Sequence, residues 1–148
     1  MMTVAVWMLL GFAVWTVVLL LSTIGVYRWA RILTGRVPIR EFRSDKVEGD
    51  DWYVRSMRAH ANCIENLPVF GAIVFALYVS GVDGELVNAL TVTVLVARII
   101  QSLIHVGLLQ TNIVVVLRFT FFLIQLICFL ALAVMVVSYG DSSMLSTM

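Results

Sequence analysis

The stretch RAHANCIENLPVFGAIVFALYVSG, residues 58–81, decides the fold. Its first eleven residues hold an arginine, a histidine, two asparagines and a glutamate, and the thirteen that follow carry no charge. A helix rises about 1.5 Å per residue, so roughly 20 largely apolar residues cross the hydrocarbon core of a bilayer. Residues 66–82 are uncharged, which predicts a membrane-spanning helix that begins upstream near Asp51.

The composition agrees with a membrane protein. The chain has 148 residues, of which 61% are hydrophobic and 13% are charged, and its mean hydropathy is +1.02. Soluble domains are about 45–50% apolar and about 25% charged, so this much apolar surface needs a lipid bilayer to cover it. The length favours one domain, residues 1–148. A net charge of +1 gives no electrostatic support for a nucleic-acid partner.

Three further apolar stretches complete a pattern of four helices. Residues 1–27 contain no Asp, Glu, Lys or Arg, and residues 86–109 and 112–140 each contain one such residue, Arg98 and Arg118. The predicted spans cover about 3–27, 53–81, 86–109 and 112–139. The last two connections are short, which makes consecutive helices antiparallel neighbours. We therefore predict an all-α membrane protein built as a four-transmembrane-helix bundle.

Basic residues in the loops predict the orientation, because short cytoplasmic loops are enriched in Lys and Arg. Residues 81–85 hold two acids and no base. The connection between the first two helices holds six bases: Arg28, Arg31, Arg36, Arg40, Arg43 and Lys46. We expect this first loop on the cytoplasmic side and both termini on the opposite side. In a bacterium the membrane would be the inner membrane.

Polar side chains gather on one face of each of the last three predicted helices. A helix turns about 100° per residue, so residues three, four or seven apart lie close together on its surface. A charged side chain at the bilayer centre costs about 2.5–3.5 kcal/mol on insertion scales, so such faces should line the bundle interior or a water-filled cavity. The three faces comprise Arg55, Arg58, Asn62, Glu65 and Asn66; Arg98, Gln101, Ser102 and His105; and Arg118 and Gln125.

Two explanations of these faces stay open. Buried polar groups join membrane helices at about 0.6–2 kcal/mol per hydrogen bond, which would account for Arg98, Gln101 and Gln125 taken alone. The set Arg58, Asn62 and Glu65 fits that explanation less well, because two opposite charges and an amide on one face exceed what packing requires.

Histidine 60 and histidine 105 are the two histidines of the chain. Their faces do not match one shared site, and no carboxylate or thiolate stands at ligand spacing from them. We therefore predict no metal site. For His105 a hydrogen-bonded position between helices and a role as donor or general base are both open.

An Arg–Asn–Glu face suits a small zwitterionic peptide. Arginine donates a planar fork to a carboxylate, glutamate accepts from an ammonium group, and asparagine both donates and accepts. A molecule such as glutathione would satisfy Arg58, Asn62 and Glu65, and Arg28 or Arg31 would take a second carboxylate. A lipophilic small molecule would reach it sideways from the bilayer.

The same residues resemble a known family signature. The motif Arg58-Ala-His-Ala-Asn62-Cys-Ile-Glu65-Asn-Leu-Pro68 is similar to the second helix of the MAPEG family, the membrane-associated proteins in eicosanoid and glutathione metabolism. Members carry Arg-Ala-x-x-Asn-x-x-Glu with Pro three residues later. They include the microsomal glutathione transferases, leukotriene-C synthase and microsomal prostaglandin E synthase. The resemblance implies a homotrimer of four-helix subunits, with glutathione between neighbouring subunits near the cytoplasmic side.

What the resemblance implies for function is a membrane glutathione transferase or peroxidase that acts on lipophilic electrophiles. It implies that Arg58, Asn62 and Glu65 belong to the glutathione site. It matches Arg98 to a third-helix arginine of the eicosanoid enzymes. Arg28, from the first helix, would also bind glutathione. At the positions of Gln101 and His105 those enzymes have tyrosines or a histidine.

The start of the fourth helix departs from the family pattern. The eicosanoid enzymes place there an arginine that activates the glutathione thiol, whereas residues 111–114 here read TNIV and the first arginine is Arg118. Thiolate is the nucleophile, and a free thiol has a pKa near 8.5, so a nearby cation or donor is needed. The catalytic candidates are Arg118, His105 and Arg31.

Two alternatives to an enzyme remain open at this point. One is a scaffold or binding protein that keeps the MAPEG fold without the chemistry. The other is a small transporter in which Glu65 exchanges protons for a substrate.

Overall fold

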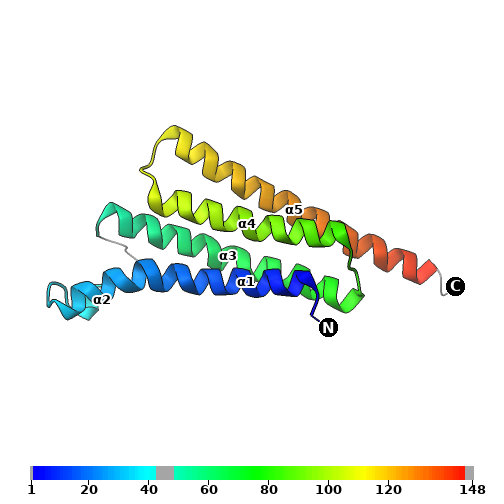
Figure 1. Cartoon of the computed structure of the whole chain (residues 1–148), viewed down its shortest axis with the longest axis horizontal. Coiled ribbons are helices and arrows are strands. Elements are labelled where there is room, and N and C mark those ends of the chain that lie inside the picture. The colour runs from blue at the N-terminus through cyan, green and yellow to red at the C-terminus, as the bar shows by residue number, and fades with distance from the viewer. Residues whose placement is uncertain (1, 43–48, 146–148) are drawn as a thin grey trace.

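The computed structural model describes residues 2–42 and 49–145, with side chains described as far as Tyr139. Long helices lie side by side along one axis (Figure 1). Arg43 and Lys46 of the first loop lie outside the described residues. In chain order the elements are α1 (Val4–Leu19), the π-helical η1 (Leu20–Gly25), α2 (Val26–Leu33), the 3-10 turn η2 (Ile39–Glu41), α3 (Asp51–Ser80), α4 (Glu85–Gly107) and α5 (Asn112–Leu145).

Four of these helical segments are long and apolar enough to cross a membrane. They are Val4–Leu33, Asp51–Ser80, Glu85–Gly107 and Asn112–Tyr139. The all-α class and the four-helix bundle predicted from the sequence are therefore confirmed.

The first helix runs past its predicted end at residue 27 and continues through α2 to Leu33. The apolar run stops at Arg28, but arginine is a good helix former, so the helix itself does not stop there. It ends where Gly35 takes the left-handed conformation, with φ +67°, and donates its N–H to the Ile32 carbonyl. Arg28 and Arg31 thus stand on helical turns and not in a loop.

Helix α3 begins at Asp51, as expected, and passes through Pro68 without ending. It stops at Gly81, whose φ of +66° is the conformation that glycine adopts at helix ends. The Val82 N–H then reaches back to the Leu77 carbonyl at 3.0 Å, which satisfies one of the last free carbonyls of the helix.

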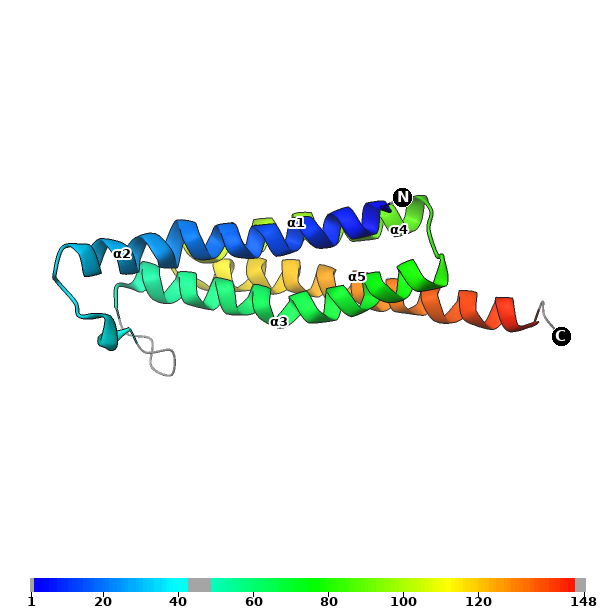
Figure 2. The ribbon, with the colours of Figure 1, turned by 90° about the horizontal axis from the view of Figure 1, so that it is seen from below.

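The two ends of the bundle differ in what they hold (Figures 1 and 2). The end of α2, the start of α3 and the connection 108–111 lie at one end, which we call the loop end. The connection 81–84, the start of α1 and the end of α5 lie at the other, which we call the terminal end. The first and last described helices therefore begin and end on one side, and that the loop end faces the cytoplasm stays a prediction.

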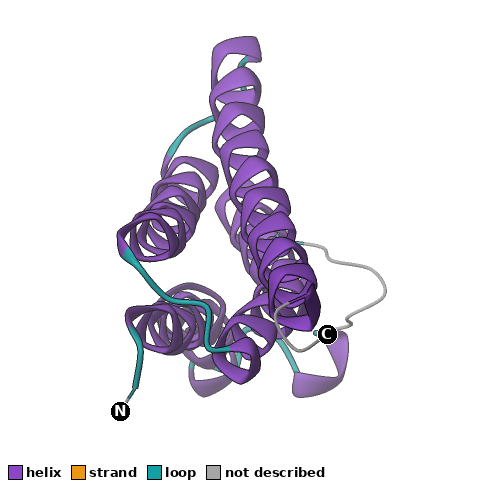
Figure 3. Ribbon diagram, turned by 90° about the vertical axis from the view of Figure 1, so that its right-hand side faces the viewer, coloured by secondary structure: helices purple, strands orange, loops and turns teal. Residues whose placement is uncertain are grey.

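Three phenylalanines from three helices form the centre of the core. Phe12 of α1 lies 5.6 Å from Phe70 of α3, and Phe70 lies 5.8 Å from Phe129 of α5, measured between ring centroids. All three are at most 4% exposed. Helices α3 and α4 each pack against both α1 and α5, so four helices surround this aromatic core. Figure 3 shows the helices from the terminal end.

Candidate active site

A cleft of about 210 Å³ lies between α3, α4 and α5 in the half of the bundle nearer the loop end. We call it the polar cleft. Its polar lining comes from Asn62 of α3, Gln101 and His105 of α4, and Arg118 of α5. Gln101 and His105 are four residues apart and so share one face of α4.

The polar cleft is electropositive. His105 interacts electrostatically with four arginines, Arg118, Arg58, Arg55 and Arg98, and Arg118 interacts with Arg58. No acidic side chain contributes to the described lining of the cleft. An anionic ligand would therefore gain from the summed field of these guanidinium groups.

Several polar atoms at the cleft lack partners. The Nδ1 atom of His105 and the Nε atom of Arg118 at the cleft are buried and have no hydrogen-bond partner among the described residues, and the same holds for the Nε atom of Arg55 nearer the start of α3. A buried polar atom left unpaired costs about 1–3 kcal/mol. Several unpaired polar atoms in one cleft are expected where a ligand supplies the missing hydrogen-bond partners.

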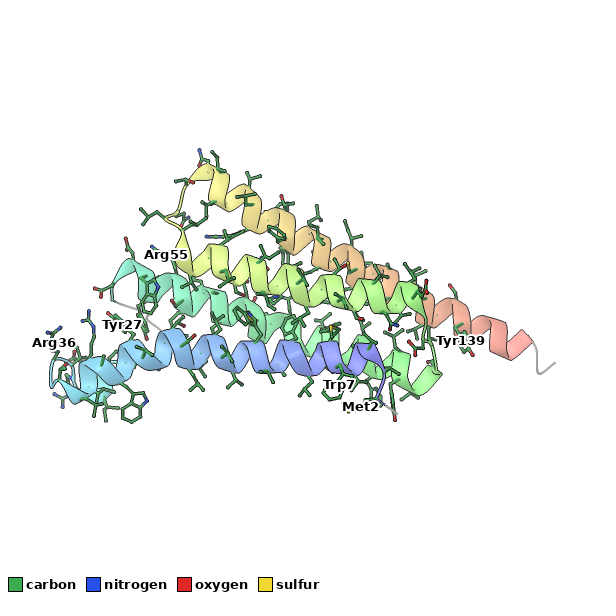
Figure 4. All side chains as sticks on the ribbon, viewed as in Figure 1. Met2, Trp7, Tyr27, Arg36, Arg55 and Tyr139 are labelled. Carbon is green, nitrogen blue, oxygen red and sulfur yellow. The ribbon has the colours of Figure 1, made fainter. Side chains whose placement is uncertain are left out.

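A second cavity lies nearer the loop end than the polar cleft. It has a volume of about 410 Å³ and is lined partly by Asp51, Arg55, Arg58 and Gln110. We call it the vestibule. Arg55 marks its position at the loop end of α3 (Figure 4). A charged ligand that arrives from this side would meet Arg55 and Arg58 before it reaches Arg118.

The residues of the polar face predicted on α3 do not all point into the polar cleft. Asn62 is half-buried and lines the polar cleft, whereas Arg58 and Glu65 are exposed on the single subunit. Asn66 turns inward and donates its side-chain N–H to the Asn62 carbonyl at 2.8 Å. Glu65 does not line the polar cleft, so any contact it makes with the same ligand would come from the outer edge of α3.

The comparison with protein families gives this arrangement a context. The model of the MAPEG family matches residues 4–138. The chain belongs to the MAPEG family. Many MAPEG members are glutathione-dependent enzymes. Neither a curated protein nor a solved structure matched the chain.

Arg98, the third-helix arginine of this MAPEG chain, lies in the core and not in the polar cleft. Its side chain is 1% exposed, and its guanidinium carbon lies 5.4 Å from the centroid of the Phe12 ring. It interacts with the Cys63 thiol, and that thiol lies 3.6 Å from the Ser102 hydroxyl. Its Nε and Nη2 atoms have no hydrogen-bond partner among the described residues.

Arg28 and Arg31 lie between α2 and the start of α3, away from the polar cleft of their own subunit. Arg28 donates its Nε–H to the Tyr53 hydroxyl at 2.8 Å, and Arg31 pairs with Asp50 at 2.8 Å. Tyr27 stacks on Tyr53 with a centroid separation of 4.2 Å. These contacts tie the first helix to α3. A role of Arg28 or Arg31 in a neighbouring MAPEG subunit stays a prediction.

The apolar wall of the cleft was not predicted from the sequence. Val115, Phe119 and Phe122 of α5 line it on the side of Arg118. Val115 and Phe122 stand three and four residues from Arg118, which was a visible signal because such residues share a helix face, whereas Phe119 is its neighbour in the sequence. In an apolar helix, however, every face offers aromatic or aliphatic residues, so this signal does not stand out.

None of the described residues suggests a metal centre. Within residues 2–42 and 49–139, no three His, Cys, Asp or Glu side chains cluster closely enough to hold a metal ion. The groups present at the cleft are cations, amides and one imidazole, which suit an anionic organic ligand.

Proposed function

We propose that this protein is a membrane-embedded, glutathione-dependent transferase or peroxidase, and that glutathione binds in the polar cleft. The observation that carries this proposal is the cluster of Arg58, Arg118, His105 and Asn62 around a cleft whose buried polar atoms lack partners. Membership of the MAPEG family supports the same class of activity.

The charges of the site suit glutathione, which carries two carboxylates and one ammonium group. Arg55 and Arg58 stand at the vestibule, where their planar forks would bind the carboxylates. The Asn62 amide would bind a peptide group of the ligand. Glu65, at the outer edge of α3, would accept from the ammonium group. This placement leaves the thiol directed toward the deeper Arg118.

Arg118 and His105 are our candidates for thiol activation. A thiol must lose its proton to become a nucleophile, and each unit by which its pKa falls requires about 1.4 kcal/mol of stabilisation of the thiolate. A guanidinium group beside the sulfur stabilises the thiolate form. Arg118 lies at the cleft although it stands deeper in α5 than the activating arginine of the eicosanoid enzymes, which supports its taking over that role.

The second substrate would be a lipophilic small molecule that enters from the bilayer. Phe119, on the apolar wall, is 63% exposed and would face lipid. The thiolate would attack an electrophilic carbon, forming a C–S bond as the leaving group departs. With a lipid hydroperoxide it would instead attack the terminal oxygen, forming an S–O bond as the O–O bond breaks and the alcohol leaves after taking up a proton. A second glutathione would then react with the resulting sulfenic acid to give glutathione disulfide and water.

We also propose that the subunits form a homotrimer, as the family resemblance implies. Arg58 and Glu65 are exposed on the single subunit, although both stand within a membrane-spanning helix. An exposed charge inside a bilayer is costly, so a neighbouring subunit that covers this face would relieve that cost. The glutathione site would then lie between subunits, and Arg28 or Arg31 of a neighbour would reach it.

The proposal is tested by titrating glutathione into detergent-purified protein in a calorimeter. We expect saturable binding that weakens about tenfold or more in Arg58→Ala and in Arg118→Ala, because each loses a hydrogen bond to a charged group. Arg36→Ala is the matched control, since Arg36 is an exposed arginine of the loop end that lies outside the polar cleft (Figure 4).

Turnover assays on a panel of electrophiles and lipid hydroperoxides complete the test. Binding without turnover across the panel would show a binding or scaffold protein. If the wild-type protein does not bind glutathione, the proposal fails. Proton-coupled flux in proteoliposomes that is lost in Glu65→Gln would then identify a transporter.

A further inference from the structure

Two buried glutamines link α4 to α5 behind the polar cleft. Gln101 is 5% exposed and Gln125 is fully buried. The Nε2 group of Gln125 donates to Gln101 Oε1 at 3.0 Å and to the Phe121 carbonyl at 2.8 Å. The Nε2 group of Gln101 donates to the Arg118 carbonyl at 3.0 Å. A buried amide is costly unless it is hydrogen-bonded, so this chain of three bonds stabilises the pair, and of its amide atoms the Gln125 Oε1 atom has no hydrogen-bond partner among the described residues.

The direction of the chain is fixed by Gln125. Both hydrogens of its Nε2 group are used, one on its own helix and one on Gln101. Because Gln101 must present Oε1 to Gln125, its Nε2 group faces α5 and the Arg118 carbonyl. Without Gln125, the Gln101 amide could rotate so that its Oε1 and Nε2 atoms exchange places.

Arg118 stands where α5 leaves the bundle. Helix α5 diverges from α3 toward the loop end (Figure 1), and its first turns are largely exposed, with Ile113 at 74% and Val116 at 63%. The Arg118 side chain makes no ion pair with any acid in the described part of the chain. Its position at the cleft therefore depends on where the backbone of α5 is held, and Gln101 holds that backbone at Arg118 itself.

We infer that Gln101, oriented by Gln125, is a positioning residue that sets the place of Arg118 in the polar cleft. The consequence for catalysis rests on the proposed function. A displacement of about 1 Å of a catalytic group can lower a rate about 100-fold, so a tether at the backbone of Arg118 has a measurable effect. Gln125 does not line the cleft, so changing it removes no group from the ligand's surroundings.

A double-mutant cycle with glutathione affinity as the readout tests this inference. Gln125→Met keeps the length of the side chain and removes its donors. We expect it to weaken glutathione binding about tenfold in the wild-type background and to have no effect in Arg118→Gln. Gln125→Leu serves as a second variant if the first does not fold. Cys128→Ala, which changes a buried α5 side chain outside the amide chain, should bind glutathione like the wild type.

A second readout does not depend on glutathione. Phenylglyoxal modifies arginine side chains, and mass spectrometry gives the rate at each site. We expect Gln125→Met to change the rate at Arg118 severalfold and to leave the rate at Arg58 unchanged. An unchanged rate at Arg118, or additive effects in the binding cycle, would overturn the inference. If wild-type protein binds no glutathione, the proposed function fails, and the Arg118 rate alone then decides whether the amides position it.

Discussion

The two halves of this bundle are packed in opposite ways although the same helices build both. Toward the terminal end, Phe12, Phe70 and Phe129 pack together in a core whose other buried members are aliphatic residues and two cysteines. Toward the loop end, the polar cleft stays open, and His105 and Arg118 bury polar atoms that lack partners among the described residues.

The difference shows how a small membrane protein supports a costly site. Close packing in one half fixes the relative positions of the helices, and apolar contacts there are individually small but collectively large. The other half then tolerates the unpaired polar atoms of the cleft, which would destabilise a bundle that lacked the aromatic core. Departures from good local packing are expected at functional sites and are offset elsewhere in the fold.

The largest effect on stability is expected when a ring of the aromatic core is removed. We expect Phe70→Ala to lower the free energy of unfolding in detergent by about 3–5 kcal/mol, because Phe70 is fully buried between two other rings. Phe75→Ala is the control on the same helix. Phe75 is 68% exposed, so its loss should change stability by less than about 0.5 kcal/mol. Equal losses in the two variants would contradict the assignment of Phe70 to a closely packed core.

Arg98 sits where the two halves meet, and its replacement has the second-largest expected effect. Arg98→Met should raise the free energy of unfolding by about 1–3 kcal/mol, because a buried guanidinium with unpaired nitrogens gives way to an apolar side chain of similar length. Denaturant unfolding in detergent measures this change. Arg58→Met, at an exposed position, should show little gain. A loss of stability in Arg98→Met would show that the contacts of Arg98 with Phe12 and with the Cys63 thiol outweigh the cost of burying its guanidinium group.

Most of the fold could be predicted from the sequence because the bilayer dictates it. An apolar run long enough to cross the membrane must be helical, since every backbone polar group has to be satisfied within the segment. The end of the first helix could not be predicted in this way. Hydropathy reports where lipid ends, and the helix continues past that point until Gly35 turns it.

The candidate site was predictable only in part. The periodicity of α4 correctly grouped Arg98, Gln101 and His105 on one buried arc. It could not show that Arg98 would turn toward Phe12 while Gln101 turns toward α5. Because α4 packs against α1, α3 and α5, one arc of about 100° faces more than one neighbour, and the sequence does not say which.

The hydrogen-bonding geometry of the Arg118 side chain can be tested separately from its positive charge. Arg118→Lys keeps a cation at the cleft but loses the planar fork of the guanidinium. We expect glutathione affinity to fall about threefold to tenfold, less than in Arg118→Ala, as measured by calorimetry. Arg36→Lys should leave the affinity unchanged. If Arg118→Lys binds as tightly as the wild type, the cleft uses Arg118 only as a point charge.

The smallest effect on stability is expected from the exposed ion pair between Arg31 and Asp50 at the loop end. The side chains of Arg31 and Asp50 are 32% and 65% exposed, and ion pairs of this kind contribute about 0.2–1 kcal/mol. Asp50→Asn should therefore lower the free energy of unfolding by less than about 1 kcal/mol, and the difference should vanish at about 1 M salt, where screening acts within about 3 Å. A double-mutant cycle with Arg31→Gln isolates the interaction energy of the ion pair from the other effects of each substitution. A loss as large as that of Phe70→Ala would show that the loop end is held by its charges as firmly as the terminal end is held by its aromatic rings.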